Sequence, residues 1–397
     1  MRFLHTSDWH LGRSFHRVSL LDAQRAFLDH LVETVRAEGV DAVLVAGDVY
    51  DRAVPPLSAV ELFDDALHRL ADLGVPTVMI SGNHDSARRL GVGAGIMGRA
   101  GIHLRTDPAT CHQPVLLPGG QGDHEGPGDH GDIAVYGLPY LEPALVRQEF
   151  GAERADHTAV LGAAMERIRA DLGRRPPGTR AVVLAHAFVT GAAPCDSERD
   201  ITAGGVQAVP AAVFDGVHYV ALGHLHGCQT VGERIRYSGS PLAYSFSEEH
   251  HRKSMWLVDL DAAGDVVAER IDTPVPRRLA RLRGRFDDLL GDPVHDRHTD
   301  AWVEATLTDP YRPPEPMAAL AKRFPHILSL AFEPDGGDED RAASYAQRLR
   351  GRTDRQIAED FVTHVRGLAP DPAERAVLDE AFDAVRAGGA GKETDGA

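Results

Sequence analysis

Five short apolar runs mark the first part of this chain, and polar residues follow each run at once. The runs have the length of buried strands. Amphipathic stretches at Leu21–Val35 and Ser58–Leu73 lie between the early runs, with Ser58 as the expected N-cap of the second helix. Buried strands that alternate with amphipathic helices are typical of an α/β fold. The five runs are Phe3–Leu4, Ala42–Ala46, Thr77–Ile80, Ala181–Ala185 and Val217–Leu222.

The residues that end these runs can bind metal ions. Ligands of an α/β sheet collect outside the carboxyl ends of its strands, so we expect all five groups to meet at one edge of the sheet. Residues two apart on an extended segment point to the same side, which pairs Asp8 with His10 and His224 with His226. Three groups contain a glycine that permits a tight turn, namely Gly47, Gly82 and Gly223. The groups are Ser7–His10, Gly47–Asp51, Gly82–Asp85, Ala185–Ala187 and Gly223–His226.

The candidate ligands mix carboxylate, amide and imidazole and include no thiolate. This mixture disfavours structural zinc and iron–sulfur clusters, suits Mn²⁺ or Fe²⁺, and suits Mg²⁺ less well. Two ions about 3.5–4 Å apart, bridged by one carboxylate, would use a set that is too large for one ion. Cys111, Cys195 and Cys228 form no CxxC pair, which excludes a disulfide framework and a cysteine-based zinc knuckle. The seven candidates are Asp8, His10, Asp48, Asn83, His186, His224 and His226.

Composition narrows the class of protein further. The 397 residues are 43% apolar and 25% charged, as in a globular protein of two or three domains. No apolar run approaches the roughly 18 residues needed to span a bilayer, and the N-terminus has no apolar signal-peptide core. We therefore expect a cytoplasmic chain without a membrane partner. With 42 basic and 59 acidic residues, the net charge is −17, so nucleic acid would have to bind through a local basic patch or bound cations.

The α/β pattern breaks at Thr273–Pro276, where we expect a domain junction. The expected parts are a first domain at 1–275, a small second domain at 276–335 and a helical tail at 336–397. Strand-like runs at Ala301–Leu307 and Ile327–Phe332 belong to the second part. Amphipathic helices at Thr353–Leu368 and Pro372–Val385, separated by Pro370, belong to the tail. A Gly- and Asp-rich surface loop is expected at 118–132, and a frayed end at 388–397.

The polar groups and their order resemble the calcineurin-like metallophosphoesterases. The signature D-x-H, G-D-x-x-D, G-N-H-D, H and G-H-x-H is complete in this chain. Three segments, Leu4–Gly12, Ala221–His226 and Tyr237–Pro241, are also similar to the SbcD family, the nuclease subunits of bacterial SbcCD complexes. The resemblance is strong over residues 1–275 and extends to the rest of the chain only by layout. It implies a metallophosphoesterase β-sandwich flanked by helices, a small α+β capping domain and a C-terminal helical tail.

The resemblance also implies a role for each polar residue. One ion would be held by Asp8, His10, Asp48 and His226, and the other by Asp48, Asn83, His186 and His224, with Asp48 as the bridge. His84 would stabilise developing charge or protonate the leaving oxygen, with Asp85 orienting its ring. Asp51 stands where archaeal and eukaryotic relatives carry histidine, in keeping with the bacterial branch. Ser197–Arg199 also matches the family, without a physical account of its role.

The implied activity is manganese-dependent hydrolysis of DNA by two metal ions. With an SbcC-like coiled-coil ATPase, such proteins act as ATP-dependent double-strand exonucleases and hairpin endonucleases in DNA repair, recombination and replication. The implied assembly is a homodimer that forms a heterotetramer with the ATPase, docked through the C-terminal tail. Five arginines within Arg277–Arg285 fit a solvated linker and a contact with the DNA backbone equally well, and the resemblance favours DNA.

Two other functions fit parts of the sequence. A small-substrate phosphodiesterase or phosphatase of the same fold would share the metal centre, but such enzymes rarely need an added cap and tail. A non-catalytic scaffold of decayed phosphoesterase fold would be expected to have lost ligands, and no ligand of the signature is missing. The sequence therefore favours the nuclease over both alternatives.

Overall fold

The computed structural model describes residues 1–119, 131–196, 208–335 and 352–389. Ser197–Arg199, most of the expected 118–132 loop and nearly all of the expected frayed end lie outside these residues. The chain divides into two compact units, Met1–Pro276 and Arg277–Ala397. Within the described residues, no helix combines the length and apolar character required to cross a bilayer.

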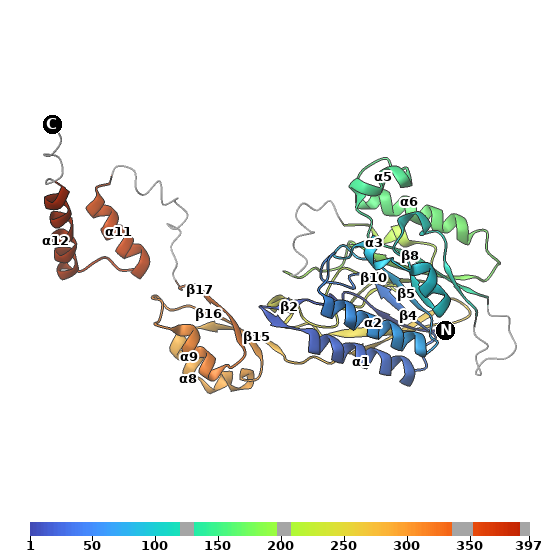
Figure 1. Cartoon of the computed structure of the whole chain (residues 1–397), viewed down its shortest axis with the longest axis horizontal. Helices are drawn as coiled ribbons and strands as arrows, with labels where there is room; N and C mark the ends of the chain where they lie inside the picture. Colours follow the sequence, from blue (N-terminus) through green and yellow to red (C-terminus); the bar gives the residue numbers. More distant parts are fainter. Residues whose placement is uncertain (120–130, 197–207, 336–351, 390–397) are drawn as a thin grey trace. The chain divides into compact units, whose positions relative to one another are not determined.

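Two six-stranded sheets form the first unit (Figure 1). The first sheet has the order β14-β13-β1-β4-β5-β6, and its strands β1, β4, β5 and β6 run parallel. The second sheet has the order β11-β12-β10-β9-β8-β7, with β12, β10, β9 and β8 parallel. The first sheet comprises β1 (Arg2–Thr6), β4 (Ala42–Ala46), β5 (Thr77–Ile80), β6 (Ile102–Leu104), β13 (Ser254–Leu260) and β14 (Val266–Asp272). The second comprises β7 (Val115–Leu117), β8 (Ile133–Leu138), β9 (Arg180–His186), β10 (Tyr219–Gly223), β11 (Gln229–Val231) and β12 (Ile235–Tyr237).

The two sheets pack face to face through one shared core. Phe3 and Leu44 of the first sheet lie in the same buried cluster as Val182, Leu184 and Ala221 of the second. Side chains alternate along a strand, so the neighbouring residues of these strands face outward and pack under helices. Burial on both faces explains why the central strands read as unbroken apolar runs. The structure confirms the predicted helix-flanked β-sandwich, although the five predicted runs divide between two sheets rather than lining one.

Helices cover the outer face of each sheet. The first sheet packs against α1 (Leu21–Ala37) and α2 (Leu57–Asp72), and the second against α5 (Pro143–Phe150) and α6 (His157–Leu172). The predicted N-cap Ser58 is wrong: α2 begins at Leu57, and Pro56 is the N-cap in extended conformation. Proline fixes the backbone at this entry, which leaves Ser58 inside the first turn. Shorter elements are β2 (Ser14–Phe15), β3 (Val18–Ser19), α3 (Ala87–Leu90), α4 (Ala94–Met97), η1 (Gly98–Ala100), η2 (Pro108–Thr110), η4 (Ala211–Phe214) and η5 (Phe246–Glu248).

The second unit contains a three-stranded parallel sheet with a core of its own. Leu282, Val303, Leu320 and Phe324 are buried together in that core. Two further helices, α11 and α12, follow in the chain, and Thr353 starts the first of them with a capping box to Gln356. The elements are β15 (Leu279–Gly284), α8 (Phe286–Gly291), η6 (Pro293–His298), β16 (Trp302–Leu307), α9 (Pro316–Arg323), β17 (Ile327–Phe332), α11 (Asp354–Arg366) and α12 (Pro372–Gly389).

The arginine-rich stretch 277–285 is not a solvated linker. Most of it forms β15, in which Ala280 and Leu282 are buried while Arg281 and Arg283 point outward. Two of its arginines lie in ion pairs, Arg277 with Asp300 and Arg283 with Glu333. The sequence analysis did not predict this strand, because its two core residues alternate with arginines and arginine is the commonest residue of the segment.

Removing the side chain of Leu44 tests the shared core of the sandwich. Leu44 is fully buried between the two sheets, so we expect Leu44→Ala to lower the free energy of unfolding by about 2–5 kcal/mol in a urea titration. Leu145 on α5 is 81% exposed and provides the matched control, since Leu145→Ala should change stability by less than about 0.5 kcal/mol. Equal losses for the two variants would contradict the described packing.

Candidate metal centre

The loops that follow β1 and β4 run side by side and fix the first candidate ligands. The backbone N–H of Asp8 donates to the carbonyl oxygen of Gly47 at 3.0 Å, and the N–H of His10 donates to that of Asp48, also at 3.0 Å. The backbone N–H of His224, just after β10 of the other sheet, donates to the Asp8 carboxylate at 3.0 Å. The centre thus lies where the carboxyl ends of strands from both sheets meet.

Four of the seven candidate ligands have left-handed backbone conformations. Their φ angles are +53° for Asp8, +44° for His10, +50° for Asp48 and +101° for His224. Among the described residues, only three other non-glycine positions have a positive φ. Such conformations cost free energy and persist where surrounding contacts enforce them, most often at functional sites. The sequence pattern does not predict these left-handed backbone conformations.

The three predicted turn glycines serve two different purposes. Gly47 has a φ of +90°, as expected for a tight turn. Gly82 and Gly223 have no positive φ, and a Cβ atom at either position would collide with its neighbours. At Gly82 it would lie 2.1 Å from Asp48 Oδ1, and at Gly223 it would lie 2.0 Å from the carbonyl oxygen of Ala46. Close approach of the chain, rather than turn geometry, requires these two glycines.

Asp8, His10 and His226 form one buried group of donor atoms. One ligand atom from each lies within 4.8 Å of the others. The Nε2 atoms of His10 and His226 are 3.2 Å apart, and Asp48 Oδ2 lies 3.6 Å from His10 Nε2. The structure therefore brings together the four side chains predicted for the first ion.

Asn83, His186 and His224 form a second group around the same aspartate. Asn83 Oδ1 lies 3.0 Å from His186 Nε2 and 3.2 Å from His224 Nδ1. Asp48 Oδ2 lies 3.5 Å from His186 Nε2. The same carboxylate oxygen is thus close to an imidazole of each group, which is the place of a bridging ligand.

The proton positions around His186 show that the donors fit a cation. Its Nδ1 lies 2.9 Å from the carbonyl oxygen of Ala46, which can only accept, so Nδ1 carries a proton. In the neutral ring, Nε2 then presents a lone pair to the oxygens of Asn83 and Asp48. Lone pairs that face one another are stabilised by a proton or a metal ion between them. Nitrogen and oxygen donors of this kind suit divalent transition metals.

Charges within the centre shift its pKa values in opposite directions. Burial opposes ionisation of Asp48, but His186 and His10 outweigh it and hold the pKa of that carboxyl well below its usual range. Burial would lower the pKa of His186, yet the Asp48 charge raises it to about 9. Burial, aided by the Asp48 charge, raises the pKa of Asp8 to about 6. Without metal, a proton on His186 therefore balances the charge of Asp48.

His84 and Asp85 lie beside the centre but make different contacts from those expected. The backbone N–H of His84 donates to Asp48 Oδ1 at 2.9 Å, and its ring Nδ1 lies 2.9 Å from the carbonyl oxygen of Asp51. The Asp85 carboxylate accepts hydrogen bonds from backbone N–H groups of Val49, Tyr50 and Gly82. The described contacts therefore place Asp51, rather than Asp85, on the His84 ring, and Asp85 holds the loops that carry Asp48 and Asn83.

Several supporting residues were not predicted from the sequence. Tyr244 Oη donates to the carbonyl oxygen of Trp9 at 2.6 Å, and Gln24 Nε2 donates to that of His10 at 2.8 Å, which clamps the Asp8–His10 loop. Glu248 and Lys253 form a buried ion pair behind His226. Each is a single residue outside any metal-ligand motif, so spacing gave no signal. The sequence signal nearest to them is the segment Tyr237–Pro241, which is similar to the SbcD family and lies three residues before Tyr244.

Two family models match this chain. The model described as calcineurin-like phosphoesterase matches residues 1–228, more than half of the chain. The chain belongs to the calcineurin-like phosphoesterase family. A second model is named for the C-terminal domain of SbcD and described as the type 5 capsule protein repressor C-terminal domain. It matches residues 275–366. Together the two matches make the chain an SbcD-like calcineurin-like phosphoesterase, and its metallophosphoesterase fold implies a binuclear metal site.

Solved structures also resemble the chain. The TT1561 protein of Thermus thermophilus is 13% identical, with a TM-score of 0.39 over 68% of this chain and 98% of that one. GAP50, an inner-membrane-complex anchor of Plasmodium, is 11% identical, with a TM-score of 0.39 over 85% and 98%. A dimetal phosphatase of Danio rerio is 14% identical, with a TM-score of 0.35 over 68% and 96%.

Metal affinity of this phosphoesterase should rise with pH. Ligands must lose their protons before a cation binds, and His186 and Asp8 hold theirs up to pH values near 9 and 6. We expect the apparent Mn²⁺ affinity to increase from pH 5.5 to pH 9, with protons released on binding. Calorimetry in two buffers of different ionisation enthalpy measures that release. A pH-independent affinity without proton release would contradict the assignment.

A methyl group at Gly82 should disrupt the centre. The added Cβ would lie 2.1 Å from Asp48 Oδ1 and 2.4 Å from the Asp48 backbone nitrogen, so the carboxylate must move. We expect Gly82→Ala to weaken Mn²⁺ binding at least tenfold in a calorimetric titration. Gly162 in α6 has open space around it and gives the control, because Gly162→Ala should leave metal binding unchanged.

Proposed function

We propose that this SbcD-like phosphoesterase is a DNA nuclease that hydrolyses phosphodiester bonds with two divalent metal ions. Mn²⁺ is the ion we propose first, with Mg²⁺ and Fe²⁺ as the other candidates. The observation that carries the proposal is the position of Asp48 Oδ2, within 3.6 Å of imidazole nitrogens of both donor groups. The match of residues 275–366 to the C-terminal domain model named for SbcD favours DNA as the substrate.

Seven residues would hold the two ions. The first ion would bind Asp8, His10, Asp48 and His226, and the second Asp48, Asn83, His186 and His224, as the signature implies. When bound, the two cations supply positive charge that polarises the phosphodiester and lowers the pKa of a water molecule. The chain itself keeps the donors close together and keeps their lone pairs directed inward.

His84 is the residue we assign to the leaving group. Its Nδ1 faces the carbonyl oxygen of Asp51, so Nδ1 carries a proton. Nε2 then carries a proton only in the imidazolium form, and in that form it can donate the proton to the departing 3′-oxygen. The backbone bond from His84 to Asp48 holds this ring next to the metal ligands.

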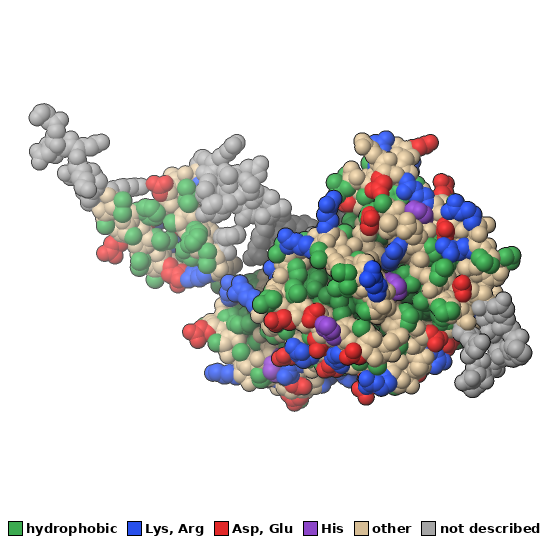
Figure 2. Space-filling model, turned by 45° about the vertical axis from the view of Figure 1, so that its right-hand side comes forward, with side chains coloured by type: hydrophobic (Ala, Val, Ile, Leu, Met, Phe, Trp, Pro, Cys, Tyr) green, Lys and Arg blue, Asp and Glu red, His purple; other side chains and the backbone are tan. Residues whose placement is uncertain are grey.

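Contacts with DNA require local positive charge in this acidic chain. On the face of the first unit seen in Figure 2, basic and acidic side chains are interspersed over the surface. We assign the backbone contact to the second unit, as a capping domain, where Arg281 and Arg283 lie on the exposed face of β15. Arg283 pairs with Glu333, so a DNA phosphate would have to compete with that carboxylate. Arginine contacts with phosphates release condensed counterions, so such binding should weaken as the salt concentration rises.

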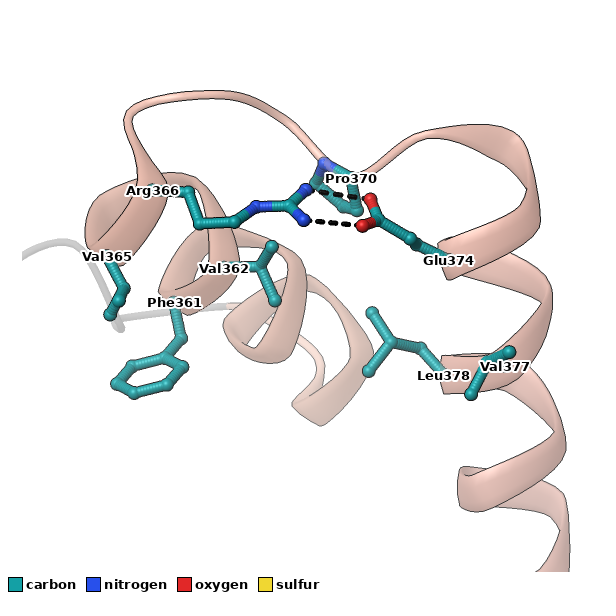
Figure 3. Close-up of a pocket in the computed structure, with 8 residues that line it drawn as sticks. All are labelled: Phe361, Val362, Val365, Arg366, Pro370, Glu374, Val377 and Leu378. Atoms are coloured by element: carbon teal, nitrogen blue, oxygen red, sulfur yellow. Dashed lines mark hydrogen bonds and ion pairs between the residues drawn. The ribbon is translucent and has the colours of Figure 1, made fainter. Parts of the chain in front are cut away.

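The tail helices provide the surface for a protein partner. Phe361 and Val365 of α11 and Val377 of α12 are more than half exposed, and they border an apolar groove (Figure 3). A paired Arg366 and Glu374 close one end of the groove. Amphipathic helices bind partners in this way, and we propose an SbcC-like coiled-coil ATPase as the partner. With it, a homodimer of this chain would form a heterotetramer in DNA repair, recombination and replication.

Cleavage of a DNA hairpin tests the proposal. The purified full-length chain should cut a labelled hairpin with Mn²⁺, alone or with its ATPase, and EDTA should abolish the cutting. Asp48→Ala should lose both metal binding and cleavage. His84→Ala should keep both ions and lose cleavage by about 10²–10⁴-fold, because it removes only proton transfer.

Other outcomes identify other functions. Loss of metal from His84→Ala would contradict the role assigned to His84. Rapid hydrolysis of a small phosphodiester without cutting of DNA would identify a small-substrate phosphodiesterase or phosphatase. Absence of bound metal in the wild-type chain would favour the remaining alternative, a non-catalytic scaffold.

A further inference from the structure

A buried ion pair lies directly behind one of the candidate ligands. Glu248, at the end of η5, is 1% exposed, and Lys253, just before β13, is 4% exposed. Their side chains form an ion pair. The chain has 42 basic residues but only three lysines, Lys253, Lys322 and Lys392, so a lysine in this interior position stands out against the composition.

Lys253 has a partner for each of its ammonium protons. Nζ donates to Ser240 Oγ at 2.9 Å, to the carbonyl oxygen of His226 at 3.0 Å and to the Glu248 carboxylate. Three acceptors around one nitrogen match the compact geometry of an ammonium group and not the planar fork of arginine. The ammonium group therefore ties the His226 backbone to the carboxylate.

The Glu248 carboxylate also reaches the His226 ring. Its Oε1 atom accepts the backbone N–H of Tyr244 at 3.1 Å and lies 3.4 Å from His226 Nδ1. The opposite ring nitrogen, Nε2, faces His10 Nε2 in the first donor group. A proton on Nδ1 thus leaves the lone pair of Nε2 directed toward the candidate metal position.

Stability alone does not explain this pair. A buried ion pair contributes little compared with apolar residues of the same volume, because both charges lose their hydration. Cys195 completes a group of donor atoms with His226 and Glu248 within 4.8 Å. We assign that group to positioning rather than to a further metal, since the Lys253 ammonium already balances the carboxylate.

We propose that Glu248 and Lys253 are positioning residues that fix the tautomer and orientation of His226 and thereby set the affinity of the first metal ion. The inference rests on the proposed metal centre. It distinguishes His226 from two other candidate imidazoles: His186 Nδ1 pairs with a neutral backbone carbonyl, and His10 Nδ1 lies 3.8 Å from Asp51 Oδ1, beyond hydrogen-bond distance. A carboxylate behind an imidazole raises its basicity as a ligand.

The double substitution Glu248→Gln with Lys253→Met tests the proposal. It removes both charges together and keeps similar side-chain volumes, so no unpaired charge remains buried. We expect one of two Mn²⁺ ions to bind about 10–100-fold more weakly in calorimetry, while the other keeps its affinity. Nitrogen NMR of the metal-free protein should show the His226 proton on Nδ1 in the wild type and a smaller share of it there in the variant, because a neutral amide oxygen is a weaker acceptor than a carboxylate.

A second ion pair in the same unit provides the control. Asp171 and Arg175 of the α6 region are 2.7 Å apart, and Asp171 also accepts a hydrogen bond from Tyr136. In the part of the chain that the structure describes, the side-chain hydrogen bonds and ion pairs given for the two residues join them to each other, to Tyr136 and to Arg174, none of which is a candidate ligand. Asp171→Asn with Arg175→Met should therefore leave both metal affinities and the His226 tautomer unchanged.

Each outcome decides the proposal. A folded double variant that binds both ions like the wild type and keeps the Nδ1 proton would overturn it. If circular dichroism shows that this variant is unfolded, Glu248→Asp decides instead. That change keeps the charge for Lys253 but retracts the carboxylate by one methylene, so one ion should still bind at least several-fold more weakly, and an unchanged affinity would overturn the proposal. A wild-type chain that binds no ion would reject the proposed metal centre itself.

Discussion

The buried carboxylate of Asp48 is the constraint around which the first unit is organised. The residue is 2% exposed, and a charge in that position must be compensated by its neighbours. The backbone N–H of His84 bonds one oxygen, and imidazoles of His10 and His186 surround the other. The left-handed backbone of Asp48 and the missing side chain at Gly82 both follow from bringing these groups so close together.

Much of this centre could be read from the sequence because each ligand lies immediately after an apolar run. The run predicts a strand, and the end of the strand places the ligand. Such reasoning could not show that β1 and β4 belong to one sheet and β9 and β10 to another, because two packed sheets bury their strands as thoroughly as one sheet under helices. The resemblance also implied that Asp85 orients the His84 ring, whereas the backbone carbonyl of Asp51 occupies that place.

Features made by single residues far apart were beyond sequence analysis. Glu248 and Lys253 lie behind His226 through the path of the chain between β12 and β13, which no local pattern encodes. In the second unit, β15 was missed because its alternating arginines resemble a charged linker. In both cases the missing information is which side chains point into the protein interior. That direction is set by packing against residues distant in sequence.

The spread of the ligands along the chain has a consequence for synthesis. Asp8 follows the first strand of one sheet, His226 follows β10 of the other, and β13 must then return to pair with β1. The donor set is therefore complete only when nearly the whole first unit has left the ribosome and closed its sandwich. A nascent or truncated chain would hold only part of the centre, so the hydrolase gains its full donor set only as folding finishes.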